Sequence, residues 1–509
     1  MISEETIAAI STAPGAGGIG IVRISGARAE EILARVFLGG EGHTAVFRDR
    51  VMRHGFVRDP LSNETIDEVL AVLMRAPHSY TGEDVAEIQC HGGVMPLRRI
   101  LELVYLQGAS PAAAGEFTKR AFLNGRIDLV QVESVIDLIN AETARSFSAA
   151  REQADGRLSF PVRAAREILL GLLAETEARI DYPEAFEQGD SGDFDTGFSR
   201  EGISEEGISK EDPRMRRIQQ AREVIGGLLE NADTGRLVRS GIRVALLGKP
   251  NAGKSSLFNA LAREEAAIVT EIPGTTRDAL EIRLSLEGFP VYLTDTAGIR
   301  EADGVVETLG IERSKAAYEQ ADIAVLLIDA SLPLSAEDSM IAQILRPEKP
   351  LVVALNKQDL PVLTDEAAVR RLIPFAGRFV ETCFPPGTGA AAGAEYKDGF
   401  TAHQKDRKYP EDGGITALEK VLIETVLFRS GASFGAGQDF LVTRERHRNL
   451  LETAATELRE AQAVFAAGDA PEFAEVNLRA AYDALGEIIG VVYTDDILDR
   501  IFSEFCIGK

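Results

Sequence analysis

Hydrophobic and polar positions divide the chain into segments of different periodicity. Short apolar runs such as Ile19–Ile24 and Asp67–Leu73 lie among glycines and prolines in the first 120 residues, and they predict an α+β domain. From about residue 121 apolar side chains recur every three to four positions, which predicts helices; a clear example is the series Val162, Ala165, Leu169 and Leu172. The chain is therefore expected to change from strands to helices near residue 120.

The pattern changes again between about residues 242 and 429. Short apolar runs, for instance Val244–Leu247 and Ile323–Ile328, alternate with helical stretches, which is typical of a parallel sheet with crossover helices. Helical spacing returns after about residue 438, as in Leu450, Ala454 and Leu458. Because helical segments flank the α/β segment on both sides, we predict a multidomain α/β and α protein in which a mostly parallel α/β domain is inserted into a discontinuous helical domain.

The predicted domains are residues 1–120 (α+β), 121–240 (first helical part), 241–429 (inserted α/β domain) and 430–509 (second helical part). Two stretches, 183–213 and 385–414, are rich in glycine and in small polar or charged residues. This composition predicts disorder, and we assign no chemistry to either stretch.

Composition and charge limit the classes of partner. The chain has 509 residues, with 55 basic and 80 acidic side chains and a net charge of −25. Such a protein has no general basic surface, so any RNA contact is expected to be local or shared with a partner. No apolar run reaches the roughly 18 residues of a membrane-spanning helix, so no membrane association is expected. Three cysteines are too few for a disulfide framework, and no signal peptide is recognisable, which predicts a cytoplasmic protein.

A phosphate-binding loop is recognisable in Gly248–Ser255, which follows a predicted strand and precedes a predicted helix. Glycines let backbone N–H groups turn toward phosphates, Lys254 supplies a positive charge, and the hydroxyl of Ser255 is suited to Mg²⁺. A Gly-rich turn with only a packing role is the alternative, but three further motifs argue against it.

Those three motifs occur in the order that a GTPase requires. Asp295–Gly298 ends a strand, where a carboxylate can reach Mg²⁺ through water, and Gly274–Arg277 lies upstream, where the hydroxyl of Thr276 can be a second Mg²⁺ ligand. Asn356–Asp359 ends a later strand, and an Asp carboxylate there can accept both N1–H and N2–H of guanine, a donor pair that adenine lacks. The candidate GTP-binding residues are Asn251, Ala252, Gly253, Lys254, Ser255, Ser256, Thr270, Glu271, Ile272, Pro273, Gly274, Thr275, Thr276, Asp295, Thr296, Ala297, Gly298, Asn356, Lys357, Gln358 and Asp359.

One position bears directly on catalysis. Many GTPases orient the attacking water with a Gln that follows the Asp-x-x-Gly glycine, whereas this chain has Ile299 there, which cannot bond to water. Another group must therefore assist hydrolysis. The candidates are a carboxylate, an arginine or a monovalent cation, and the side chains concerned are Glu301, Asp303, Glu307, Arg277 and Arg300.

With these motifs in view, the chain resembles the MnmE (TrmE) family of tRNA-modification GTPases, which are TrmE-Era-like GTPases. The resemblance covers nearly the whole chain. Besides the GTPase motifs, it is carried by Gly17–Gly26, Tyr80–Asp84, Gly115–Gly125 and the segment Phe505–Lys509.

The resemblance implies an N-terminal folate-binding and dimerisation domain, a helical domain and an inserted Ras-like G domain. It also implies a homodimer whose G domains pair when GTP and K⁺ are bound. The implied partners are the flavoprotein MnmG (GidA), in a heterotetramer, and tRNA. The implied reaction adds an aminomethyl or carboxymethylaminomethyl group at C5 of the wobble uridine, position 34, of certain tRNAs.

Residue roles follow from the same resemblance. K⁺ is expected on the side chain of Asn251 and the backbone carbonyls of Thr270, Ile272 and Thr275, and Glu307 is the expected water-positioning residue. The implied cofactors are K⁺, Mg²⁺ and 5-formyltetrahydrofolate or a related tetrahydrofolate. The folate would be bound by Arg23, Glu87, Arg126 and Lys509.

Two cysteines leave alternatives open. Cys506 can act as a nucleophile or acid in tRNA modification, or simply pack beside the last helix, and the resemblance favours the chemical role. Thr382–Cys383 is the best match for the loop beneath guanine.

Two other functions also remain open for the whole protein. One is a regulatory G protein in ribosome assembly without modification chemistry of its own, and the other is a folate-dependent transferase that the G domain only regulates.

Overall fold

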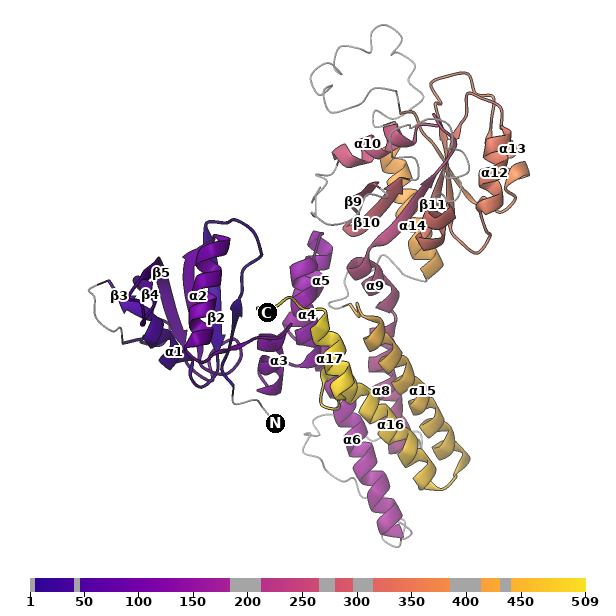
Figure 1. Cartoon of the computed structure of the whole chain (residues 1–509). Helices are drawn as coiled ribbons and strands as arrows, with labels where there is room; N and C mark the ends of the chain where they lie inside the picture. Colours follow the sequence, from indigo (N-terminus) through magenta and orange to yellow (C-terminus); the bar gives the residue numbers. More distant parts are fainter. Residues whose placement is uncertain are drawn as a thin grey trace, which may run out of the picture. The chain divides into compact units, whose positions relative to one another are not determined.

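The computed structural model describes residues 5–40, 46–183, 212–264, 280–295, 315–384, 413–430 and 441–509. They belong to two compact units, shown as a ribbon in Figure 1. The first unit comprises residues 1–139, 153–221 and 456–509, and the second comprises 140–152 and 222–455.

A seven-stranded sheet forms the N-terminal part of the first unit, in the order β3-β4-β5-β6-β2-β1-β7. Its pairs are antiparallel except for β1 and β7. The sheet and two helices bury a common apolar core that includes Ile24, Ile88 and Ile100. The elements are β1 (Ile7–Ile10), β2 (Ile19–Ser25), α1 (Ala29–Val36), β3 (Phe37–Gly39), β4 (Arg53–Arg58), β5 (Thr65–Met74), β6 (Val85–His91), α2 (Val94–Leu106) and β7 (Ser110–Pro111).

Helices make up the rest of the first unit. The apolar series predicted from the sequence, Val162 to Leu172, is the buried face of α6 and packs along the buried face of α16. A cation–π contact joins the same two helices, because the Arg166 guanidinium lies 3.9 Å from the centre of the Tyr482 ring. The helices are α3 (Glu116–Leu123), α4 (Leu129–Asn140), α6 (Ser159–Asp181), α16 (Pro471–Ile489) and α17 (Asp495–Ser503).

The second unit contains a six-stranded sheet in the order β13-β12-β11-β8-β10-β9. All neighbours are parallel except the β9–β10 hairpin, and β11 and β12 are buried along their whole length, as expected for central strands between helical layers. The predicted alternation of strands and helices is therefore confirmed. The elements are α9 (Ala232–Ser240), β8 (Ile242–Leu247), α10 (Lys254–Glu264), β9 (Leu280–Leu286), β10 (Phe289–Asp295), β11 (Ile323–Asp329), α12 (Ala336–Ile344), β12 (Leu351–Asn356), α13 (Glu366–Leu372), β13 (Arg378–Glu381) and α14 (Ile415–Ser430).

Four of the described helices contribute residues to both units: α4, whose last residue Asn140 belongs to the second unit, α5 (Ala144–Ala154), α8 (Pro213–Leu229) and α15 (Glu445–Ala467). The predicted helical domain, residues 121–240 and 430–509, includes residues 140–152, 222–240 and 441–455, which the structure groups with the sheet of the second unit. For residues 140–152 the reason is a set of contacts to the β9–β10 hairpin. Thr143 Oγ1 donates to the Gly288 carbonyl at 2.8 Å, and the Arg145 guanidinium lies 4.4 Å from the centre of the Phe289 ring.

The α6 helix offers a direct test of this packing, because two adjacent leucines differ in burial. Leu169 is fully buried, whereas Leu170 is 45% exposed. We expect Leu169→Ala to lower the free energy of opening of α6 by about 2–5 kcal/mol, because it leaves a cavity in the core. Leu170→Ala should change it by less than about 0.5 kcal/mol. Amide hydrogen exchange of α6 measures both values, and equal effects would contradict this packing.

Candidate functional site

The phosphate loop joins β8 to α10 in the second unit, as the sequence predicted. Two of its glycines are required by geometry. A Cβ at Gly248 would lie 2.6 Å from the Leu327 carbonyl oxygen, and one at Gly253 would lie 2.2 Å from Asn356 Nδ2. Both have positive φ angles, +149° and +107°, which side chains disfavour. The loop therefore keeps its shape only with glycine at these positions.

Lys254 is buried inside this loop. Its Nζ donates to the carbonyls of Gly248 and Lys249, at 2.5 and 2.9 Å, so the positive charge is held where the motif requires it. Ser255 and Asn251 are exposed beside it, and Asn251 adopts a left-handed conformation with φ +60° that asparagine tolerates well.

An ion pair that sequence reasoning missed supports the same loop. Lys249, at a variable position of the motif, is buried and pairs with Asp338 at 2.8 Å. Asp338 also accepts the backbone N–H of Ser335 and so completes the capping box of α12. No local pattern marks this pair, because the two residues are 89 positions apart.

The strand ends place three of the four motifs at one edge of the sheet. Asp295 ends β10 opposite Leu246, the penultimate residue of the strand that leads into the phosphate loop. Asn356 ends β12, and its register partner is Asp329, the last residue of β11. The carboxyl ends of parallel strands are the usual position of a nucleotide in such sheets.

The remaining predicted residues of the GTPase site lie outside the described residues. They are Thr270, Glu271, Ile272, Pro273, Gly274, Thr275, Thr276, Arg277, Thr296, Ala297, Gly298, Ile299, Arg300, Glu301, Asp303 and Glu307. Their predicted roles in binding Mg²⁺ and K⁺ and in catalysis stay predictions.

The predicted guanine loop lies against the Asn356–Asp359 motif. Asn356 is fully buried, and its Oδ1 accepts from Thr382 Oγ1 at 3.3 Å and from the Phe384 N–H at 3.2 Å. Its Nδ2 donates to the Ala252 carbonyl of the phosphate loop at 2.8 Å. One side chain thus joins the phosphate loop to the loop that contains Thr382–Cys383.

Lys357, the next residue of this motif, is held by an ion pair. Its Nζ lies 2.6 Å from Asp329 Oδ2. Burial opposes ionisation of Asp329, but hydrogen bonds from Lys357 and Ser331 more than compensate and hold the pKa of this carboxyl below its usual value.

A second candidate site surrounds Tyr80 in the first unit. Arg23 and Glu87 are direct cross-strand partners on β2 and β6 and form an ion pair at 2.9 Å. The guanidinium groups of Arg23 and Arg126 each lie 5.4 Å from the centre of the Tyr80 ring. Three of the four predicted folate residues are therefore gathered around one aromatic ring.

The fourth, Lys509, lies in a segment bound to the first turn of α3. Its carbonyl accepts the Phe117 N–H at 3.2 Å, and the Phe117 ring lies 5.6 Å from the Arg23 guanidinium. The Cys506 carbonyl accepts the Gly115 N–H at 3.4 Å, while the Cys506 side chain is exposed. The geometry thus places residues 506–509 beside the predicted folate residues.

Arg126 also borders a cavity of about 380 Å³, within the range of a small-molecule site. The cavity has aromatic walls from Phe122 and Tyr493 and an ion pair between Arg163 and Asp128. Among the described residues, no cluster of three His, Cys, Asp or Glu side chains offers a metal site. Nor does any helix in the described part of the chain have the length and hydrophobicity to cross a bilayer.

Two family models match the chain. The model described as "GTP-binding protein TrmE N-terminus" matches residues 6–126, and the model described as "MnmE helical domain" matches residues 129–506.

Similar curated proteins have the same length. The chain is 41% identical over 512 residues to the tRNA modification GTPase MnmE of Alkaliphilus metalliredigens, covering 100% of both chains. It is 39% identical to that of Geobacillus kaustophilus, again covering 100% of both. It is 38% identical to that of Lactiplantibacillus plantarum, covering 99% of this chain and 98% of the relative.

Similar solved structures include a G domain and an Era protein. The G domain of the Thermotoga maritima FeoB iron transporter is 27% identical with a TM-score of 0.22, covering 28% of this chain and 87% of that one. Era from Aquifex aeolicus is 22% identical with a TM-score of 0.25, covering 42% of this chain and 66% of that one. Both TM-scores are low, so no conclusion about this chain is based on these two structures.

The three cysteines are expected to differ in reactivity. Burial raises the pKa of the Cys90 thiol to about 11, with a contribution from Asp67. Burial and a hydrogen bond with Asp359 do the same for Cys383, also to about 11. At pH 8 both thiols are protonated and unreactive, so iodoacetamide should first label the exposed Cys506.

Peptide mass spectrometry over time measures the three labelling rates. The rates at Cys90 and Cys383 should rise only as the pH approaches 11. Labelling of either thiol as fast as Cys506 at pH 8 would contradict the described burial.

Proposed function

The chain belongs to the MnmE (TrmE) family of tRNA modification GTPases, and we propose that it hydrolyses GTP in a K⁺-dependent reaction activated by pairing of its G domains. With the flavoprotein MnmG (GidA), in a heterotetramer, it adds an aminomethyl or carboxymethylaminomethyl group at C5 of the wobble uridine, position 34, of certain tRNAs. It acts in the cytoplasm as a homodimer whose subunits associate through their N-terminal domains.

The observation that carries this proposal is the junction at Asn356. Its amide joins the loop that holds Lys254 to the loop expected beneath guanine, so the triphosphate and base sites have a fixed separation. The residues present fit Mg²⁺ as well, because Ser255 is exposed at the start of α10 beside the buried ammonium of Lys254. Thr276 would be the second protein ligand.

A monovalent cation would do what an arginine does in other GTPases, which is to neutralise charge that develops on the transferred phosphoryl group. Such a catalytic cation is needed because Ile299 stands in place of the Gln that usually orients the attacking water. Asn251 fits a K⁺ site, since it is exposed on the phosphate loop and its side-chain carbonyl is a neutral oxygen ligand. Thr270, Ile272 and Thr275 would add backbone carbonyls, and Glu307 would orient the attacking water, with Arg277 as a further candidate.

The surroundings of Tyr80 fit a tetrahydrofolate such as 5-formyltetrahydrofolate. The Arg126 guanidinium beside Tyr80 is suited to a carboxylate of its glutamate part. Glu87 is a carboxylate that can accept from donor groups of the pterin, and Arg23, which pairs with Glu87 at 2.9 Å, would lie at the same end of the cofactor. Lys509 adds a third basic side chain. The bound folate would supply the one-carbon unit, and the exposed thiol of Cys506 would take part in its transfer.

Cation dependence tests the GTPase part of the proposal. We expect GTP hydrolysis in K⁺ to exceed that in Na⁺ by roughly tenfold or more, because backbone carbonyl oxygens replace the hydration shell of K⁺ more readily than that of Na⁺. Asn251→Ala should abolish the difference between the two ions. Asn259→Ala is the matched control, because Asn259 is exposed on α10 in the same segment, and it should leave the difference unchanged. Equal rates in K⁺ and Na⁺ for the natural protein would refute the cation role.

The modification part is tested by mass spectrometry of wobble nucleosides from cells that contain only a variant protein. Cys506→Ser should remove the modified nucleoside but leave GTP hydrolysis unchanged, because the residue belongs to the first unit and the phosphate loop to the second. Ser503→Ala, three residues upstream and also exposed, is the control. Normal nucleosides in the Cys506→Ser strain would favour a regulatory G protein without modification chemistry.

A further inference from the structure

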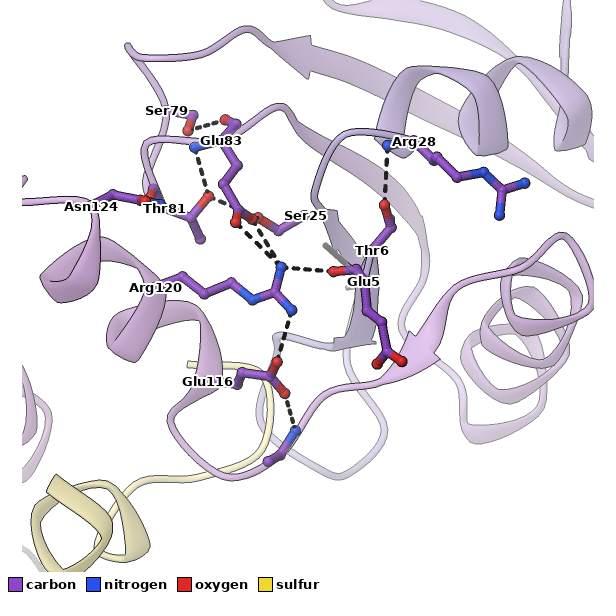
Figure 2. Close-up of polar contacts among 11 residues, drawn as sticks. Glu5, Thr6, Ser25, Arg28, Ser79, Thr81, Glu83, Glu116, Arg120 and Asn124 are labelled. Carbon is purple, nitrogen blue, oxygen red and sulfur yellow. Dashed lines mark hydrogen bonds and ion pairs between the residues drawn. The ribbon is translucent and has the colours of Figure 1, made fainter. Parts of the chain in front are cut away.

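Two segments carry the family resemblance, Tyr80–Asp84 and Gly115–Gly125, and most of their residues have no role in the sites described so far. In the structure they are joined by one buried side chain, Arg120 of α3, at the centre of the polar network in Figure 2. The role of these segments therefore depends on which groups Arg120 holds in position.

Arg120 is only 5% exposed and binds three groups. One terminal nitrogen donates to the carboxylate of Glu83 at 3.1 Å and to the Glu5 carbonyl at 2.8 Å. The other donates to Glu116 at 2.9 Å. A guanidinium presents several donors in a fixed plane, so its partners fix its position closely.

The far side of the network comprises the last residue of β2, Ser25, and the segment before β6. Glu83 accepts from Ser25 Oγ at 2.8 Å, and Ser25 Oγ lies 2.7 Å from Thr81 Oγ1. Ser25 and Thr81 are both fully buried. Glu83, one partner of Arg120, is thus itself held by a fully buried hydroxyl.

The near side of the network belongs to the loop before α3. The second oxygen of Glu116 accepts the Ala113 N–H at 2.7 Å, which fixes the turn that leads into the helix. Within that turn, Gly115 has φ +65°, and a Cβ there would lie 2.9 Å from Phe502 and Phe505. Because Glu116 accepts from both Arg120 and the Ala113 N–H, it links the Arg120 side chain to the backbone of residues 113–116.

This same backbone holds the segment of Cys506. Ala114 and Ile507 form an antiparallel bridge, and the N–H groups of Gly115 and Phe117 donate to the carbonyls of Cys506 and Lys509. Gly508, with φ +95°, approaches the Ile10 carbonyl so closely that a Cβ would lie 2.1 Å from it. The position of the Cys506 thiol thus depends on the loop that Glu116 and Arg120 fix.

We propose that Arg120 and Glu116 are positioning residues that set the place of Cys506 relative to Arg23, Arg126 and Tyr80. This inference rests on the proposed function, because it assumes that Cys506 takes part in tRNA modification. It adds a role for residues that contact neither GTP nor the predicted folate ligands.

The first test is Glu116→Ala. It releases Ala113 and one side of Arg120, yet Arg120 keeps Glu83 and the Glu5 carbonyl, so no buried charge is left alone. Glu116→Gln keeps one acceptor oxygen and should restore part of the effect. Glu175→Ala is the matched control, because Glu175 of α6 likewise bonds two partners, Arg179 and Arg217, at similar exposure.

Two measurements follow these variants. A fluorescent label on Cys506 should show lower anisotropy in Glu116→Ala, because the segment is no longer held. In the unlabelled protein with its flavoprotein partner, kcat for tRNA modification should fall by roughly 100-fold with KM for tRNA unchanged. GTP hydrolysis should stay at the natural rate, since the phosphate loop is in the other unit.

A second variant reaches the same segment without touching the network. Gly508→Ala adds a methyl group against the Ile10 carbonyl, so it should also lower the anisotropy of the Cys506 label and reduce kcat. Gly468→Ala is the control, because Gly468 has a similar φ of +71° but nothing within 4 Å of its Cβ position.

The outcomes separate this inference from the proposed function. Unchanged anisotropy in Glu116→Ala overturns the positioning role of Glu116 and Arg120, whatever Gly508→Ala shows, and so do equal losses in the control variants. If the natural protein does not modify tRNA, the proposed function fails, while the anisotropy of labelled Cys506 still decides whether Glu116 and Gly508 hold the segment.

Discussion

The nucleotide-binding half of this protein depends on one buried amide. Asn356 donates to the Ala252 carbonyl and accepts from Thr382 and Phe384, so a single side chain connects the phosphate loop with the loop after β13. The same amide explains Gly253, whose missing Cβ leaves the space that Nδ2 occupies. Because all three partners are buried, water cannot replace a lost bond, and the geometry of both loops follows from this one position.

Much of the fold was accessible from the sequence because its signals are local. The alternation of apolar runs and helical stretches predicted the sheet of the second unit, and the strand-to-helix context of Gly248–Ser255 predicted the phosphate loop. The pairing of Lys249 with Asp338 was not accessible, because it joins residues 89 positions apart through a capping box. The place of residues 140–152 was not accessible for the same reason, since contacts with the β9–β10 hairpin, rather than helical periodicity, decide where they pack.

The site around Tyr80 shows what a family resemblance adds. Nothing in the local pattern relates Arg23 to Glu87, which are 64 residues apart, yet the antiparallel register of β2 and β6 places them directly opposite. The resemblance supplied the residues, and the register supplies the physical reason why they meet. Neither source indicated Arg120, because a charged residue in an amphipathic helix normally predicts an exposed position.

Residues 140–152 connect the β9–β10 hairpin to the neighbouring segments of the chain. The hairpin they hold begins at Leu280, directly after the segment expected to bind K⁺ and Mg²⁺, and ends at Asp295, where the next nucleotide motif begins. Thr143 donates a hydrogen bond to Gly288 and Arg145 packs on the Phe289 ring, both at the turn of the hairpin. The chain on either side of residues 140–152 continues into the other unit. This short segment therefore belongs to the second unit by its contacts and is connected to the first unit by its covalent bonds at both ends.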